Sequence, residues 1–283
     1  MPIAFFTRVV TLRFLATGEP FQSLQYQFRI SRTAISEIVI ATCYERINSL
    51  GRKYLKTPSS EEEWLQVSEM FESRWNIPNR LGAIDGRCGV QWDRALDGTI
   101  WNKSDLKNHL SSAENGLHVP PPAPLPGREL AVPYAITGDD AFGLKTFLMK
   151  PYPLLGLSNE GRIYNYRLSR MRRVSENAFG ILANKWRIFL SPVVLEPEKV
   201  QMITLAALTL HNFLLPKKTS NYGNIDDLSM GDVEVTSSSW LDLSLPCSNN
   251  HSSKAKLIRA EFKDYFNNDG AVSWQWHACG IER

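Results

Sequence analysis

The strongest constraint on the fold is a short apolar run that ends in an acid and has glycines on both sides, Gly82-Ala83-Ile84-Asp85-Gly86. A second apolar run, at residues 131–137, is also followed by aspartates. Apolar runs of this length are typical of buried strands. Glycines near an acid leave room for a cation and a phosphate to approach the backbone. The sequence therefore predicts strands that end in acids, the first of them at Asp85.

A long helix is predicted after these strands, over residues 168–189. Its apolar face consists of Met171, Val174, Ala178, Ile181 and Leu182. Glu176 lies on the opposite side of the helical wheel, with Arg172 and Arg173. A surface ion pair with one of these arginines contributes only a few tenths of a kcal/mol. The alternative is a metal ligand contributed by the helix, and the spacing alone favours the ion pair.

The first 58 residues predict a small helical module that resembles a helix-turn-helix. Short helices are expected at residues 11–16, from Pro20 onward, and at Arg32–Cys43, where Ser31 is the N-cap. Polar and basic groups at the start of the last helix are what such a module presents to a DNA groove and its phosphates. A helical bundle without a ligand is the alternative, and the residues do not decide between the two.

Three later segments are predicted from local signals. Ser60 and Glu63 form a capping box ahead of an amphipathic helix. The proline-rich run at residues 119–127 predicts an extended surface loop. From residue 216 the chain is polar and acidic, so disorder is expected until a last helix at residues 254–266.

The charge of the chain is unevenly distributed, although its net value is only +3. Residues 1–59 contain eight Arg or Lys and three Glu, and residues 162–187 contain seven Arg or Lys and one Glu. These zones are candidate phosphate-contacting faces, or else solvated surfaces balanced by acidic stretches. The residues predicted to contact DNA are Arg32, Thr33, Ser36, Arg170, Arg172 and Arg173.

Composition narrows the class of protein. The chain has 283 residues, 43% of them hydrophobic, as expected for a soluble globular protein of one large or two modest domains. Its four cysteines lie far apart, which suggests neither a zinc site nor a disulfide framework and fits reduced thiols in the cytoplasm or nucleus. No apolar run approaches the roughly 20 residues of a membrane span, so no membrane partner is expected.

A series of short motifs follows in a fixed order over most of residues 10–215. They are Phe21-Gln22-Ser23-Leu24, Phe28-Arg29-Ile30-Ser31-Arg32, Ser59-Ser60-Glu61-Glu62-Glu63-Trp64, Gly82-Ala83-Ile84-Asp85-Gly86, Gly138-Asp139-Asp140-Ala141-Phe142, Tyr164-Asn165-Tyr166-Arg167-Leu168-Ser169-Arg170, Glu176-Asn177-Ala178-Phe179-Gly180-Ile181-Leu182 and Leu210-His211-Asn212-Phe213. In these motifs the chain resembles the PIF/Harbinger transposase superfamily and the Harbinger transposase-derived nucleases, including plant proteins of the antagonist-of-like-heterochromatin type.

The resemblance implies an α/β, RNase H-like fold, with a mixed sheet, flanking helices and an Asp-Asp-Glu set that binds two divalent cations. Asp85, Asp97 and Glu176 match the three acids, which would hold Mg²⁺ or Mn²⁺ for cleavage of DNA. Asp139 matches a further family acid and would assist the metal. Its alternative role is an N-cap for a helix at Ala141–Met149.

The chain departs from the family between the first two acids. In the family fold two strands lie between them, which requires at least about 20 residues. Here Asp97 follows Asp85 by twelve positions, so two central strands are expected to be missing. Missing strands expose a sheet edge and remove the rigid support of metal ligands. Any inherited nuclease activity is therefore expected to be impaired.

The predicted domains are a helix-turn-helix-like module at 1–58, an RNase H-like nuclease domain at 59–215 that is truncated between 86 and 97, and a polar, largely disordered tail at 216–283 with a terminal helix. The leading hypothesis is an impaired, metal-dependent DNA nuclease. The alternatives are a DNA-binding or protein-interaction factor without cleavage, and a defective product that does not fold stably. The resemblance makes a Myb-like partner and a nuclear location plausible. His211 is expected to be packed or capping rather than catalytic.

Overall fold

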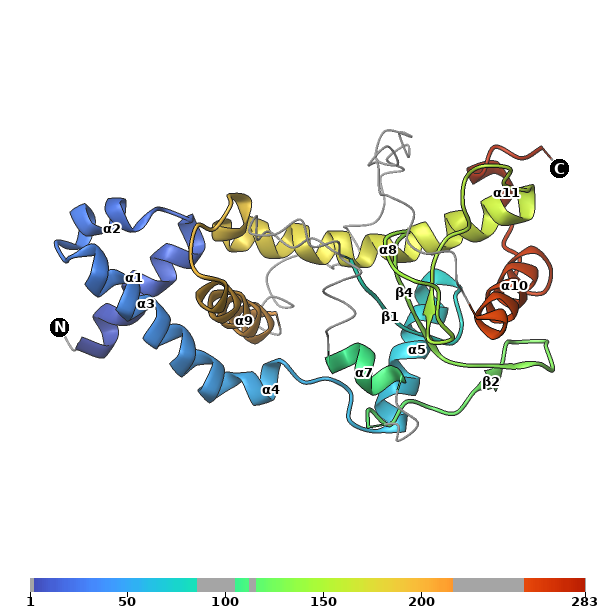
Figure 1. Cartoon of the computed structure of the whole chain (residues 1–283), viewed down its shortest axis with the longest axis horizontal. Helices are drawn as coiled ribbons and strands as arrows, with labels where there is room; N and C mark the ends of the chain where they lie inside the picture. The colour runs from blue at the N-terminus through green and yellow to red at the C-terminus, as the bar shows by residue number, and fades with distance from the viewer. Residues whose placement is uncertain (1–2, 86–104, 112–115, 216–251, 283) are drawn as a thin grey trace. The chain divides into compact units, whose positions relative to one another are not determined.

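The computed structural model describes residues 3–85, 105–111, 116–215 and 252–282 (Figure 1). These residues form two compact units. Among the described residues, the first unit consists of 3–57 and 178–215, and the second of 58–85, 105–111, 116–177 and 252–282. The domain boundaries that the sequence predicts, at residues 58 and 215, stay predictions.

The first unit is helical. Its elements are α1 (Ile3–Thr17), α2 (Phe21–Phe28), α3 (Arg32–Arg46), a π-helical turn at Ile47–Gly51, α4 (Arg52–Tyr54), the last residues of α8 (Asn159–Lys185), a 3-10 turn at Arg187–Leu190 and α9 (Pro197–Leu214). The three predicted N-terminal helices are confirmed, although the first begins earlier than expected. Their assignment as a helix-turn-helix-like module stays a prediction.

Local signals explain where these helices begin. Ser31 adopts an extended conformation, and its Oγ accepts the backbone N–H of Ala34 at 3.2 Å, as predicted for an N-cap. Apolar residues at helical spacing then form the core of the unit, with Ile35 and Val39 of α3 fully buried against Ile203 of α9. His211 of α9 is also buried, as expected for a packed residue.

The second unit combines helices with a small parallel sheet. Its elements are α5 (Glu61–Trp75), β1 (Arg80–Ala83), α7 (Asp105–Ser111), β2 (Ala123–Pro124), β3 (Ala131–Val132), β4 (Ala135–Thr137), β5 (Leu148–Met149), most of α8, α10 (Ser253–Asn267) and α11 (Gln275–Ala278). The parallel sheet has the order β1-β4-β5, and β2 pairs with β3 in antiparallel orientation. This mixed α/β architecture is compatible with a DDE nuclease fold.

The strand register brings the two predicted acid-terminated runs side by side. Gly82 of β1 pairs with Ile136 of β4, and Ala83 pairs with Thr137. The apolar run at residues 131–137 is two strands rather than one, because Pro133 separates β3 from β4 and has no N–H for a ladder bond. The two strands predicted to be missing would lie between residues 86 and 97. These residues are outside the part of the chain that the structure describes.

The capping box at the start of α5 is confirmed with one change. Ser60 Oγ accepts the Glu63 N–H at 3.3 Å. The carboxylate of Glu63 accepts the N–H of Ser59, at 2.7 Å, rather than that of the cap residue itself. The helix then continues to Trp75.

Two predictions for the second unit need correction. Residues 141–149 contain a turn and strand β5 instead of a helix, because the chain returns to pair with β4. The long helix begins at Asn159, nine positions before the predicted start, so Tyr164 also packs in the core. Residues 123–124 of the proline-rich run form β2, and Leu125 is buried although the segment is extended.

The helix predicted near residue 260 is confirmed as α10, and it belongs to the core of the second unit. Phe262 and Phe266 are fully buried in one cluster with Tyr164 and Leu168 of α8. Residues 216–251, where disorder is expected, lie outside the described residues. None of the described helices is both long and apolar enough to cross a membrane.

Candidate functional site

The ends of β1 and β4 gather two of the predicted acids. Asp85 follows β1 and Asp139 follows β4. Since the two strands are parallel neighbours, their carboxyl ends meet at one edge of the sheet. The pairing continues past β1, because the Ile84 N–H donates to the carbonyl of Thr137 at 2.8 Å. The two aspartates therefore follow adjacent strand ends in the second unit.

Helix α8 brings a third carboxylate to the same place. Ser175 Oγ donates to the carbonyl of Ala83 at 3.1 Å, which fixes this part of the helix against the end of β1. Glu176 is the next residue. We define the acidic cluster as Asp85, Asp139 and Glu176.

The three carboxylates of the acidic cluster converge on Arg172. Its Nη2 lies 3.6 Å from Asp85 Oδ1, 3.9 Å from Asp139 Oδ2 and 3.8 Å from Glu176 Oε1. The side chains of Arg172 and Asp85 are only 15% and 11% exposed, whereas that of Glu176 is 47% exposed. Arg172 therefore compensates part of the negative charge at the partly buried end of the cluster, where solvent screens charges least.

Asp139 combines this ion pair with a local turn. Its Oδ1 accepts the N–H of Ala141 at 2.9 Å, two residues further along the chain. Burial raises the pKa of its carboxyl group, while Arg172 and the hydrogen bond from Ala141 oppose that change. The neighbouring Asp140 pairs instead with Lys150, whose Nζ lies 3.0 Å away. Of these two adjacent aspartates, Asp139 is the one that faces Arg172.

The structure brings together two of the three acids matched to the catalytic set, Asp85 and Glu176, and adds Asp139. Asp97 lies outside the described residues. The ion pair between Arg172 and Glu176, expected from their spacing, is present. Sequence reasoning missed that the same arginine also faces two aspartates, because that depends on strand pairing far from α8 in the chain.

The chemistry of the acidic cluster suits a divalent cation, but its arrangement does not. Carboxylate oxygens are the ligands that Mg²⁺ prefers. In the part of the chain that the structure describes, however, no three His, Cys, Asp or Glu side chains are grouped closely enough to hold a metal ion. The oxygens are spread around a guanidinium group instead. The cluster as it stands does not fit a metal.

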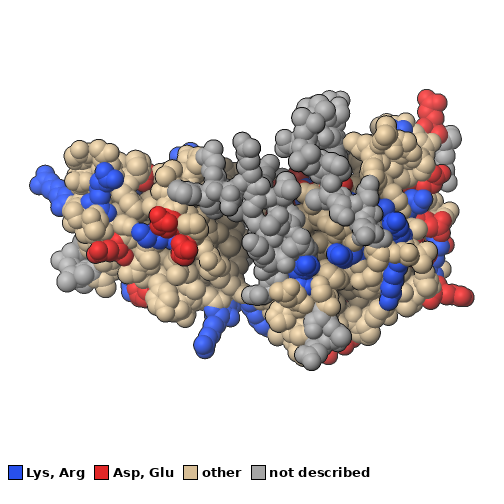
Figure 2. Space-filling model, in the orientation of Figure 1, with Lys and Arg blue, Asp and Glu red and all other residues tan. Residues whose placement is uncertain are grey.

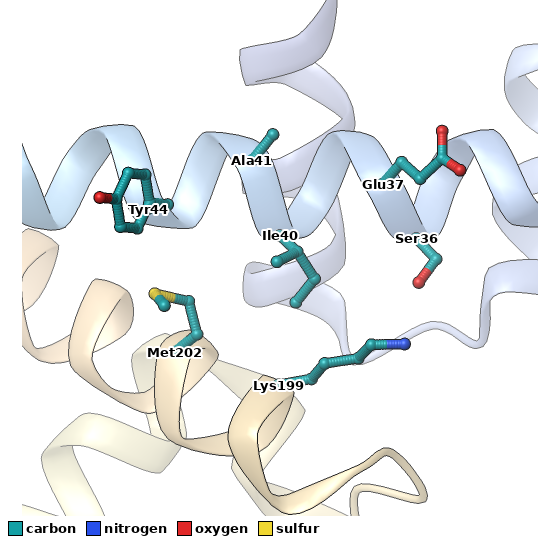
Figure 3. A pocket seen from close by; sticks show the side chains of 7 residues that line it. All are labelled: Ser36, Glu37, Ile40, Ala41, Tyr44, Lys199 and Met202. Carbon is teal, nitrogen blue, oxygen red and sulfur yellow. The ribbon is translucent and has the colours of Figure 1, made fainter.

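The residues predicted to contact DNA fall on both units. In the first unit, Arg32 and Thr33 are exposed at the start of α3. Ser36 is half-buried and lines an apolar groove between α3 and α9, in which Figure 3 shows Ile40 pointing from α3 toward α9. The groove also contains Met202.

In the second unit, Arg170 lies with its guanidinium carbon 4.1 Å from the ring centre of Trp274, and Arg172 belongs to the cluster described above. Arg173 is half-buried. On the face drawn in Figure 2, the described basic side chains are spread among acidic and uncharged ones rather than gathered into one patch. The proposed DNA contacts stay predictions.

Comparison with known proteins gives one match. Residues 91–212 match the family described as DDE superfamily endonuclease. The matched segment begins after Asp85 and contains Asp97, Asp139 and Glu176. No curated protein and no solved structure matches the chain. The similarity of this segment to DDE superfamily endonucleases supports a transposase-derived nuclease.

Proposed function

We propose that the chain is a transposase-derived DNA nuclease of the PIF/Harbinger type with an RNase H-like domain, and that its activity is impaired. One observation carries the proposal: Asp85, after the end of β1, and Glu176, on α8, which the resemblance matches to the first and third family acids, converge on Arg172 in the second unit. The family match over residues 91–212 supports the same class of enzyme.

The divalent metal is part of this proposal. Nucleases of the DDE superfamily generally use divalent metals, and the resemblance assigns Mg²⁺ or Mn²⁺ to Asp85, Asp97 and Glu176, assisted by Asp139. Because the described carboxylates face a guanidinium group instead, we assign no reaction step to a metal. The short spacing between Asp85 and Asp97 adds a second reason for impairment.

Nicking of supercoiled DNA in Mn²⁺ tests the proposal. We expect slow nicking by the wild-type protein and none above background by Asp85→Asn, because that change removes the charge of one assigned ligand. Asp140→Asn is the matched control, since Asp140 is the adjacent acid that pairs with Lys150. We expect this variant to nick at the wild-type rate.

The outcome against the proposal is a folded wild-type protein that never nicks DNA, or nicking that persists unchanged in Asp85→Asn.

A DNA-binding factor without cleavage is the second candidate. It is favoured by the pairing of Arg172 with all three acids of the cluster, which compensates part of their charge. Exposed Arg32 and Thr33 at the start of α3 would contact phosphates in this case. DNA, a Myb-like partner protein and a nuclear location belong to this proposal as they do to the first.

Binding measured over a range of salt concentrations tests this candidate. We expect the affinity for duplex DNA to fall as salt rises and to be unchanged in Asp85→Asn. Arg32→Gln is expected to weaken binding and to reduce the slope of log affinity against log salt by about 1, the value for one lost phosphate contact. Thr7→Ala, a change of a half-buried neutral residue on α1, serves as the control. An affinity that does not depend on salt would exclude phosphate contacts as its source.

A further inference from the structure

We propose that Arg172 is the resident counter-cation of the acidic cluster, and that Arg172 and a divalent metal ion exclude each other there. The inference deepens the proposed function, because it concerns the carboxylates assigned to the nuclease. It states what controls metal access to them, and its test does not depend on DNA cleavage.

The central position of one nitrogen is the first argument. A single atom, Arg172 Nη2, makes all three ion pairs, at 3.6, 3.8 and 3.9 Å. The acids come from three different places in the chain, the end of β1, the end of β4 and α8. Arg172 therefore stands at a point that all three carboxylates face.

The lengths of these contacts are the second argument. All three exceed the usual range of a hydrogen bond, so the guanidinium group is held by charge rather than by directed bonds. The Arg172 Nε is buried without a hydrogen-bond partner among the described residues. Oxygens bound to Mg²⁺ lie at about 2.0–2.1 Å from the ion, much closer together than around this guanidinium.

The third argument is that the fold fixes Arg172 in this place. Arg172 and Glu176 are one helical turn apart, and Ser175 between them is hydrogen-bonded to the carbonyl of Ala83. The side chain of Arg172 is 15% exposed, unlike a freely moving surface arginine.

The charges of the cluster explain why Arg172 and a divalent cation exclude each other. Three carboxylates and one guanidinium sum to −2 when all are ionised, and without Arg172 the sum is −3. A divalent cation that enters beside Arg172 is repelled by it, and this repulsion is strong in a partly buried site. Removal of the guanidinium group therefore both frees the oxygens and deepens the negative potential that attracts a cation.

Mn²⁺ titration by calorimetry tests the proposal on four full-length proteins: wild type, Arg172→Met, Arg172→Lys and Arg173→Met. We expect Arg172→Met to bind Mn²⁺ at least tenfold more tightly than wild type. Arg172→Lys keeps the positive charge and is expected to bind as wild type does. Arg173→Met removes the neighbouring arginine of the same helix, which makes none of the cluster's ion pairs, and is also expected to match wild type.

Equal Mn²⁺ affinity in wild type and Arg172→Met would overturn the proposal, as would an equal gain in Arg173→Met. If Arg172→Met is unfolded without metal, the titration is followed by circular dichroism, and the proposal requires Mn²⁺ to restore the folded state. Failure of that restoration also overturns it. A variant that gains Mn²⁺ but does not nick DNA would retain this inference and count against the nuclease.

Discussion

Replacing Arg80 with methionine is expected to raise the free energy of unfolding by about 1–4 kcal/mol, by analogy with the range found when buried ion pairs are replaced by apolar side chains. Arg80 lies on β1 and is completely buried. None of its guanidinium nitrogens has a hydrogen-bond partner among the described residues. Its guanidinium carbon lies 4.0 Å from the ring centre of Phe262, a contact that offsets only part of the cost of burying the charge.

The pH dependence of this effect has a definite sign. Burial lowers the pKa of Arg80 from its usual value to about 10, so the unfolded chain holds the proton more tightly than the folded one. The destabilisation is complete well below pH 10 and diminishes as the pH rises above about 10. The stability difference between Arg80→Met and wild type is therefore expected to be constant from pH 7 to 9 and smaller at pH 11.

Urea unfolding followed by tryptophan fluorescence measures this difference. Arg74→Met is the control, because Arg74 is exposed on α5, and its replacement is expected to change stability by less than about 0.5 kcal/mol. A loss of stability in Arg80→Met would mean that the buried charge is stabilised in the folded protein by more than the aromatic contact.

Replacing Phe262 with alanine is expected to lower the free energy of unfolding by about 3–5 kcal/mol, the usual cost of removing a buried phenylalanine. Phe262 is fully buried on α10 and packs in the main core of the second unit. Leu257→Ala is the matched control on the same helix, since Leu257 is 67% exposed. The control is expected to change stability by less than about 0.5 kcal/mol.

Thermal and urea unfolding of both variants measure the effect. Equal, small losses in Phe262→Ala and Leu257→Ala would mean that α10 contributes little to the core and behaves as a peripheral helix.

Local sequence signals predicted the parts of the fold that are fixed locally. Ser31 and Ser60 mark helix starts because each side chain accepts an N–H within three residues of itself. The apolar run before Asp85 predicted a strand, because a buried strand appears in the sequence as several consecutive apolar residues. Such signals also placed α10 within one residue of its ends.

Features that depend on distant partners could not be predicted in this way. The convergence on Arg172 requires β1 and β4 to be neighbours, and their residues are more than 50 positions apart. The turn after Asp139 resembles a helix start locally, but pairing of β5 with β4 determines its structure. The burial of Arg80 has no local signal at all, because an arginine in a strand ordinarily predicts an exposed edge.

The place of α10 in the core has a consequence during synthesis on the ribosome. The part of the second unit that ends at residue 177 is made first, and Phe266 follows 89 residues later (266 − 177). At about 5–20 residues per second, that interval lasts about 4–18 s. Throughout it, Leu168 and Met171 of the nascent chain lack the helix that covers them in the folded protein. The growing chain therefore presents apolar surface to chaperones, or to other nascent chains, until α10 emerges.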